Sequence, residues 1–174
     1  MAGTGPTDLQ TLAEEFLAAC VESLNTIPTF APGLAGAPER SFVSPGQPQY
    51  DCCPDGQLTV HVPAVNSDPL QPLKNHTRAN LVSLTATILR CVPSTDEDGN
   101  YPTVIEVQAA ADQVNADGWA LWNHIFNLIS AGQLFRLCEK IQWQGLRSIT
   151  PSGGCGGWTL NLTVQTDGYQ EVIP

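Results

Sequence analysis

The hydrophobic pattern of the chain predicts a first helix over residues 8–25. Apolar residues recur there every three or four positions, which places them on one face of a helix and leaves the glutamates mainly on the other. The apolar stripe consists of Leu9, Leu12, Ala13, Phe16, Leu17, Cys20, Val21 and Leu24. Asp8 can cap the first turn, and Pro28 places the end of the helix near Asn25. We therefore expect this helix to pack one face against a core.

Residues 26–56 follow a different pattern, because proline and glycine are too frequent there for a helix or a central strand. We predict an extended, proline-rich arm. Four apolar or aromatic side chains are spread along it: Phe30, Phe42, Val43 and Tyr50. Such side chains in an irregular segment favour packing against another surface, either of the same domain or of a neighbouring subunit. These four residues are the candidate subunit-interface residues of the arm.

Residues 57–166 contain the predicted sheet and one long helix. Alternation of apolar and polar residues predicts four strands. They are residues 57–62, 80–92, 141–148 and 158–165. The glycine-rich stretch 153–157 lacks the Lys-Ser/Thr of a phosphate-binding loop and leads into a strand, so we interpret it as a hairpin turn.

The long helix is predicted over residues 103–131. Its apolar ladder consists of Val104, Val107, Ala111, Val114, Gly118, Leu121, Ile125 and Leu128, and it is widened by Trp119, Trp122, Phe126 and Ile129. A glycine at position 118 weakens a helix, which favours either a kink or a close helix approach there. Gly132 provides a stop for the helix.

The order of these elements predicts a single α+β domain over residues 1–174, with a tail at 167–174. We expect a mostly antiparallel four-stranded sheet with two helices packed on one face and the proline-rich extended arm beside it. The other face of the sheet is predicted to be polar and uncovered, because threonine and glutamine occupy the alternate strand positions. The sheet edges are then available for another chain.

Charge excludes some partners. The chain of 174 residues has 17 Asp and Glu against 7 Lys and Arg, which gives a formal net charge of −10. The cations are scattered, so a nucleic-acid grip or an anionic membrane as partner is not expected. The N-terminal residues 1–8 have neither the basic start nor the apolar centre of a signal peptide, which favours a protein made and kept in a cytosol.

Six cysteines lack the C-x-x-C spacing of zinc and redox sites. Cys20, Cys91 and Cys138 lie in apolar patterns, where we expect thiols that behave as small hydrophobes. Cys52 and Cys53 lie in a loop and Cys155 lies between glycines, so oxidation outside a cell is conceivable for these three. A bridge from Cys52 or Cys53 to a distant cysteine is the less favoured alternative in a cytosol.

No catalytic or metal motif is present. His61, His76 and His124 share no metal-ligand spacing. Asp96, Glu97 and Asp98 precede a Gly-Asn turn in a sequence similar to the start of a calcium loop, but Val107 stands where the bidentate Glu is required, which favours a solvated acidic loop. We therefore expect no cofactor and no metal. A thiol-dependent enzyme built on Cys52 or Cys53 is the alternative from a different class.

The order of segments points to a family. A helix, "FVSPGQPQYDCC" leading into "QLTVHV", a strand ending "ILRCVP", the helix "VIEVQAAADQVNADGWALWNHI" and the closing "PSGGCGGWTLNLTVQ" together resemble the tail terminator (neck) proteins of long-tailed phages that infect actinobacteria. The resemblance extends from Thr7 to Thr166. The family's short motifs carry no chemistry that can be transferred residue by residue.

The resemblance implies a structural virion protein of the tail–neck region, assembled in the host cytoplasm. Such a protein forms a homohexameric ring that caps the tail tube, ends its polymerisation and joins it to the head-side connector protein. DNA would pass through the ring without specific binding, which suits an acidic chain, and Asp96, Glu97 and Asp98 are the candidate lumen-facing loop. The alternative within this class is another neck component, such as a head-closure or tail-completion protein.

Overall fold

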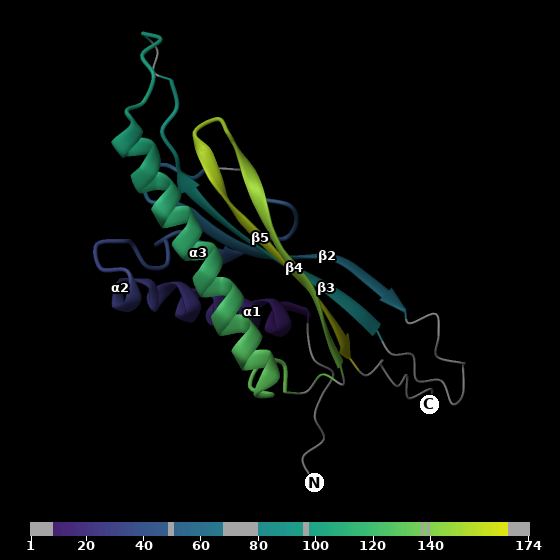
Figure 1. Ribbon diagram of the computed structural model, residues 1–174. Helices are drawn as coiled ribbons and strands as arrows, with labels where there is room; N and C mark the ends of the chain where they lie inside the picture. Colours follow the sequence, from purple (N-terminus) through teal and green to yellow (C-terminus); the bar gives the residue numbers. More distant parts are fainter. Residues whose placement is uncertain are drawn as a thin grey trace, which may run out of the picture.

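Two long helices lie on one face of a twisted sheet in the computed structural model of the chain (Figure 1). The structure describes residues 9–48, 51–67, 80–95, 98–136, 138 and 140–166. Within these ranges the helices are α1 (Leu9–Asn25), the short α2 (Ile27–Phe30) and α3 (Val104–Ser130). The strands are β1 (Ser41–Val43), β2 (Gln57–Ser67), β3 (Asn80–Cys91), β4 (Lys140–Ser152) and β5 (Cys155–Thr166).

The prediction of a mostly antiparallel four-stranded sheet is wrong. The described residues form a five-stranded mixed sheet in the order β1-β2-β3-β5-β4, and β1 pairs with β2 in parallel. The fifth strand lies inside the proline-rich arm, where Val43 faces Val60. Three residues between Pro38 and Pro45 are too few to show an alternating pattern, so the pairing is set by the neighbouring strand and not by a local signal.

Strands β2, β4 and β5 are longer than their patterns indicate, whereas β3 ends one residue earlier than predicted. In β2 the register shifts between His61 and Ala64, so the alternation is lost at Pro63 although the strand continues to Ser67. The β4–β5 hairpin confirms the predicted turn but tightens it to Gly153 and Gly154, both of which have positive φ.

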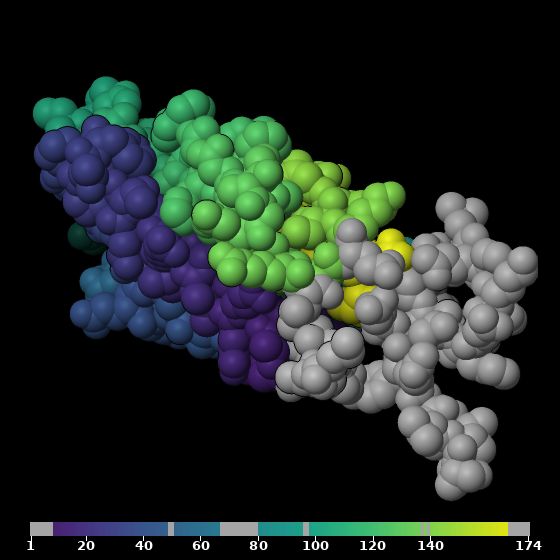
Figure 2. All heavy atoms as spheres, turned by 90° about the horizontal axis from the view of Figure 1, so that it is seen from below, coloured from purple at the N-terminus to yellow at the C-terminus, as the bar shows by residue number. Residues whose placement is uncertain are grey.

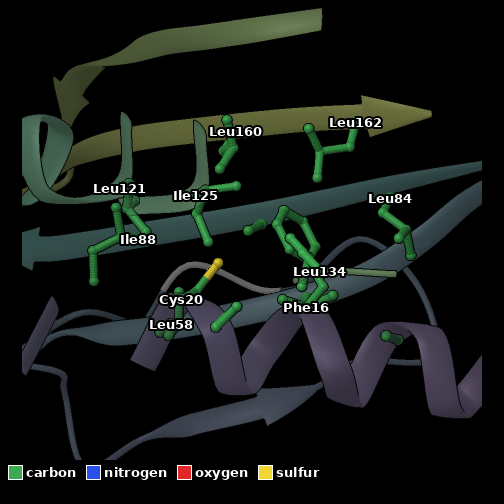
Figure 3. Packing of buried hydrophobic residues seen from close by; sticks show 14 of the residues in the cluster. Phe16, Cys20, Leu58, Leu84, Ile88, Leu121, Ile125, Leu134, Leu160 and Leu162 are labelled. Carbon is green, nitrogen blue, oxygen red and sulfur yellow. The ribbon is translucent and has the colours of Figure 1, made fainter. Parts of the chain in front are cut away.

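The core lies between the helices and one face of the sheet. Leu12, Phe16, Cys20 and Leu24 of α1 are buried, as the apolar stripe predicts. Figure 3 shows Phe16 and Cys20 from α1, Leu121 and Ile125 from α3, and Leu58, Ile88 and Leu160 from the sheet meeting in this core. Burying such side chains contributes about 1.5–3 kcal/mol each, so this shared core is the main reason that the two helices lie on one face.

Helix α3 is buried only in its second half. Its buried residues run from Ala116 to Ile125, whereas Val104 and Val107 are exposed, so the predicted core ladder is wrong for the first turns. Trp119, Trp122 and Phe126 are exposed too, instead of widening the buried face. For the first turns Figure 1 shows the reason: they extend past the end of β3. The three aromatic side chains lie further along α3, next to its buried positions but on another side of the helix. Periodicity identifies an apolar face but not how far the sheet beneath it reaches.

Gly118 lies where α3 approaches the sheet most closely. A Cβ at this position would come within 2.7 Å of the Trp158 indole. The same indole donates a hydrogen bond from Nε1 to the Val114 carbonyl at 2.7 Å. Gly118 therefore leaves room for a side chain of β5, whereas the sequence indicated either a kink or a close helix approach.

The opposite face of the sheet is polar, as predicted, but it is covered in part. Thr59, Thr87 and Thr163 are buried although they alternate with core residues. At one end of this face Cys52 packs against Leu89 and Cys155. The loop that contains Cys52 therefore covers a region that was expected to be open.

Candidate interaction surface

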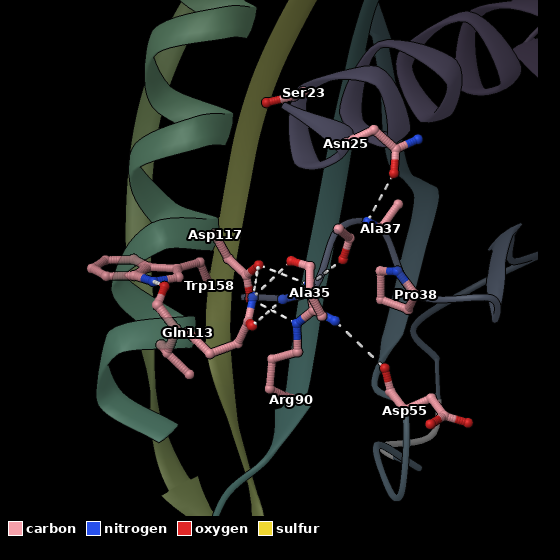
Figure 4. A network of polar contacts seen from close by, with 12 residues as sticks. Ser23, Asn25, Ala35, Ala37, Pro38, Asp55, Arg90, Gln113, Asp117 and Trp158 are labelled. Carbon is pink, nitrogen blue, oxygen red and sulfur yellow. Dashed lines mark hydrogen bonds and ion pairs between the residues drawn. The ribbon is translucent and has the colours of Figure 1, made fainter. Parts of the chain in front are cut away.

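A buried ion pair ties the arm to the helix and the sheet (Figure 4). Arg90 of β3 donates from Nε and Nη2 to the two carboxylate oxygens of Asp117 in α3, each at 2.8 Å. The two side chains are only 7% and 0% exposed. Arg90 also donates to the Gly36 carbonyl in the arm at 2.6 Å. One guanidinium thus joins three elements, and its planar geometry suits the bidentate contact.

Neighbouring hydrogen bonds extend this network. Gln113 of α3 accepts from the Ala35 amide at 2.8 Å and donates to the Ala35 carbonyl at 3.1 Å. Asn25 at the end of α1 accepts from the Ala37 amide at 3.1 Å. Burial raises the pKa of the Asp117 carboxyl, and the hydrogen bonds and positive charge of Arg90 act in the opposite direction. The first part of the arm is therefore held by side chains from both long helices and β3.

Two disulfides fix the second part of the arm. Cys52 is bonded to Cys155 and Cys53 to Cys91, with Cα–Cα distances of 5.8 and 4.9 Å. The expectation of a Cys91 thiol is wrong, and the less favoured bridge to a distant cysteine is the one observed. Cys20 and Cys138 are thiols, and burial raises the pKa of Cys20 far above its usual range. Cys91 is the last residue of β3, and the apolar pattern there reflects the strand. That pattern contains no information about the distant loop whose Cys53 lies beside it in the fold.

The arm residues singled out as interface candidates have different environments. Phe30 and Phe42 are exposed, and Val43 is half-buried against the core. Tyr50 lies outside the described residues, as do Asp96 and Glu97 of the acidic loop, whereas Asp98 is described and exposed. A contact of Phe30 or Phe42 with another subunit stays a prediction, and so does a lumen-facing position for Asp98.

The described residues contain no group of three or more His, Cys, Asp and Glu side chains that could hold a metal ion. Cys52 and Cys53 are oxidised and have no thiolate to act as a nucleophile in this state. His61 is buried on the sheet, and desolvation lowers its pKa. His76 lies outside the described residues. Cys52 and Cys53, on which the enzymatic alternative depends, are thus the two cysteines whose disulfides hold the arm.

The first turns of α3 expose an apolar surface that we call the α3 tip, defined as residues 101–112. Tyr101, Val104 and Ile105 are 86%, 84% and 81% exposed. Thr103 caps the helix: its hydroxyl accepts from the Glu106 amide, and the Glu106 carboxylate accepts from the Thr103 amide at 2.8 Å. Glu106 and Asp112 add negative charge beside these apolar side chains. The helix is therefore well formed where it has no core beneath it.

An apolar groove adjoins the α3 tip. Its volume is about 410 Å³, and it lies between α3 and the β4–β5 hairpin. Val107, Ala111 and Val114 form the helix side, and Ile149 and Trp158 belong to the strand side. A groove of this size with apolar walls fits apolar side chains from a partner.

The edge strand β4 carries a second surface, which we call the β4 edge: β4 with Arg136, Trp119, Trp122 and Phe126. Trp143 of β4 meets Trp122 and Phe126 edge-on, with ring centroids 5.0 and 6.2 Å apart. Figure 2 shows the surface of α3, in green, adjoining α1, in purple, and the yellow-green strand residues. Among the described strands β4 pairs only with β5, so its outer edge has no strand neighbour. Aromatic side chains that stay exposed beside an open edge are typical of interaction sites.

Comparison with models of known protein families gave no match, and comparison with curated proteins gave none either. No described helix combines the length and the apolar character that crossing a membrane requires. The geometry of the two surfaces must therefore support any functional conclusion.

The sequence prediction missed the α3 tip and the Arg90–Asp117 pair. It made the sheet edges available for another chain but did not single out β4, and it counted the aromatic side chains of α3 as core and Arg90 among scattered cations. A signal for the pair existed, since Asp117 interrupts the most apolar helix of the chain, and a carboxylate on a buried face requires a partner.

Proposed function

We propose that this chain is a structural subunit of a phage neck, a tail terminator that forms a ring, caps the tail tube and joins it to the head-side connector. The observation that carries the proposal is the exposed apolar surface of α3. Exposed apolar side chains on a rigid helix favour association, and both the α3 tip and the aromatic side chains near β4 have this property. The order of sequence segments, which resembles the tail terminator family, supports the specific assignment.

The charge of the chain supports a role as a conduit. Six copies at a net charge of −10 each would carry about −60, which repels the phosphate backbone and lets DNA slide past. The proposal therefore includes DNA as a passing polymer without specific contacts. Its protein partners are further copies of this chain, a tail tube protein and a head–tail connector protein.

The mass of the purified full-length chain in solution, followed by electron microscopy, tests this proposal. We expect rings with a central hole, and added tube protein should show them bound at tube ends. Rings that bind a capsid portal and not a tube would favour a head-closure or other neck protein instead. A chain that stays monomeric and loses a measurable activity when its reduced Cys52 and Cys53 are alkylated would contradict the proposal and favour the enzymatic alternative.

A further inference from the structure

The unpaired cations among the described residues lie along β4 or just before it. The structure describes five of the seven Lys and Arg residues. Arg40 pairs with Asp51 and Arg90 pairs with Asp117. The remaining three are Arg136, Lys140 and Arg147, which are exposed, lie in or just before β4, and form no ion pair with a described residue. In a chain with a net charge of −10, strand β4 contains two basic residues and no acidic one.

The backbone of β4 is poorly suited to pairing with another strand. Its register shifts between Trp143 and Gly145 and again between Ile149 and Ser152. Such bulges interrupt the row of free amides and carbonyls that strand addition needs. Lys140 and Arg147 pair with Gln165 and Thr159, so both side chains lie on the polar face, while Trp143 lies on the helix-covered face. A partner at this edge would therefore contact side chains on both sides of the strand.

The complementary features occur at the α3 tip. Acidic side chains are also exposed elsewhere, and on α1 they are Glu14 and Glu22, of which Glu22 lies 3.9 Å from His124 of α3. The large apolar side chain exposed on α1 is Leu9 alone. The α3 tip combines Glu106 and Asp112 with Tyr101, Val104 and Ile105. Its Val107 and Ala111 form one wall of the apolar groove, whose other wall belongs to β4 and β5. Its negative charge is complementary to the cations of β4, and its apolar side chains can cover the exposed aromatic side chains of the β4 edge.

We propose that the β4 edge of one copy binds the α3 tip of the next copy. The proposal rests on the ring function above and names its interface. The two surfaces differ in charge, so each is complementary to the other and not to itself, which gives a head-to-tail contact of the kind that closes rings. The tip ends at Asp112 and the aromatic part of the β4 edge begins at Trp119, seven residues or about 10 Å further along the same helix, so one rigid element presents both sides of the contact.

Charge reversal on each side tests the interface in the full-length chain. K140E/R147E keeps a charge at every edge position, so it still protects the strand edge, but it makes the β4 edge acidic. We expect it to raise the concentration needed for half-assembly by on the order of tenfold or more. Q108K/D112K changes two exposed positions of the tip without touching the Thr103–Glu106 cap, and we expect a similar loss.

The decisive sample is the chain that carries all four substitutions. If the two surfaces meet, the reversed charges are again opposite and assembly returns to within about threefold of the original chain. E14K adds positive charge at an exposed position of α1 outside both surfaces and should leave assembly unchanged. Thermal unfolding of every variant shows whether a loss reflects misfolding.

Each result decides between distinct claims. If the original chain forms rings and neither reversal weakens them, or the fourfold variant fails to recover, this interface is wrong while the ring function stands. If the original chain forms only symmetric dimers, the head-to-tail contact is wrong. If it does not associate at all, the proposed function itself fails.

Discussion

The arm and the α3–β4 side of the molecule differ in how many of their side chains have partners within the chain. The arm is irregular and rich in proline, yet it is tied by Arg90, by Gln113 and by two disulfides. Helix α3 and strand β4 are regular, yet they expose Val104, Ile105 and Trp119. Regular secondary structure therefore does not indicate here which region belongs to the core of one chain.

The difference indicates which surface would gain favourable free energy when a second copy binds. Polar groups of the arm already have partners inside the chain, so a neighbouring subunit would gain little from them. Apolar side chains on α3 are held by a helix that forms without them, so covering them costs little ordering. The comparison therefore favours α3 and β4, and not the proline-rich arm, as the region that binds another copy.

The largest expected effect is the loss of the buried ion pair. Asp117→Ala leaves the Arg90 guanidinium buried without its carboxylate, and we expect the free energy of unfolding to fall by about 3–5 kcal/mol in urea denaturation. Asp112→Ala, an exposed aspartate on the same helix, is the matched control and should change stability by less than about 0.5 kcal/mol. Equal stability of the two variants would mean that the arm is not held through this pair.

The second largest effect is expected from removing the Cys52–Cys155 disulfide. Cys52→Ser with Cys155→Ser opens a bridge between residues 103 positions apart, and we expect a loss of about 2–4 kcal/mol. Thermal unfolding measures it, with Cys138→Ser as the control. A reducing agent should destabilise the original chain and leave the double variant less affected. A double variant as stable as the original would show that the disulfide does not hold the arm.

A smaller effect on stability is expected from the exposed side. Val104→Ser with Ile105→Ser should alter the free energy of unfolding by less than about 1 kcal/mol, because both side chains are more than four-fifths exposed. The same variant should assemble less well, since it removes apolar area from the α3 tip. Light scattering measures the mass and urea denaturation the stability. A strongly destabilised variant would contradict the assignment of this surface as unpartnered within one chain.

The smallest effect concerns the helix cap. Hydrogen bonds from Thr103 lower the pKa of Glu106. Because the folded pKa lies below the unfolded one, the ionised carboxylate stabilises the cap above the usual glutamate range, and this support is lost as the pH falls through the lowered pKa. Thr103→Ala should return the Glu106 pKa towards its ordinary value in an NMR titration, with Thr85→Ala as a control. An unchanged pKa would show that the cap does not form.

Local patterns predicted the elements that depend on them. The stripe from Leu12 to Leu24, the alternation in β3 and the turn at Gly153 each follow from neighbouring residues. Strand β1 could not be predicted, because its three residues acquire a partner only when β2 lies beside them. The Cys53–Cys91 bridge and the Arg90–Asp117 pair likewise depend on contacts between distant segments, which periodicity does not contain.

The exposed surfaces could not be predicted from local patterns either. The apolar residues of α3 fit one broad stripe, but the stripe does not separate those that are buried from those that are not. Ile125 is buried, whereas Val104 in the first turn and Trp119 among the buried positions are both exposed. The candidate interaction surface is therefore a consequence of the fold and not of a motif.

The mass of the full-length chain in solution, measured by light scattering over a range of concentrations, tests the central claim most directly. We expect a closed oligomer whose mass reaches a plateau at a fixed multiple of 18.6 kDa, with six copies as the number that the family resemblance implies. A mass of one chain at every concentration, with the fold intact, would contradict the account.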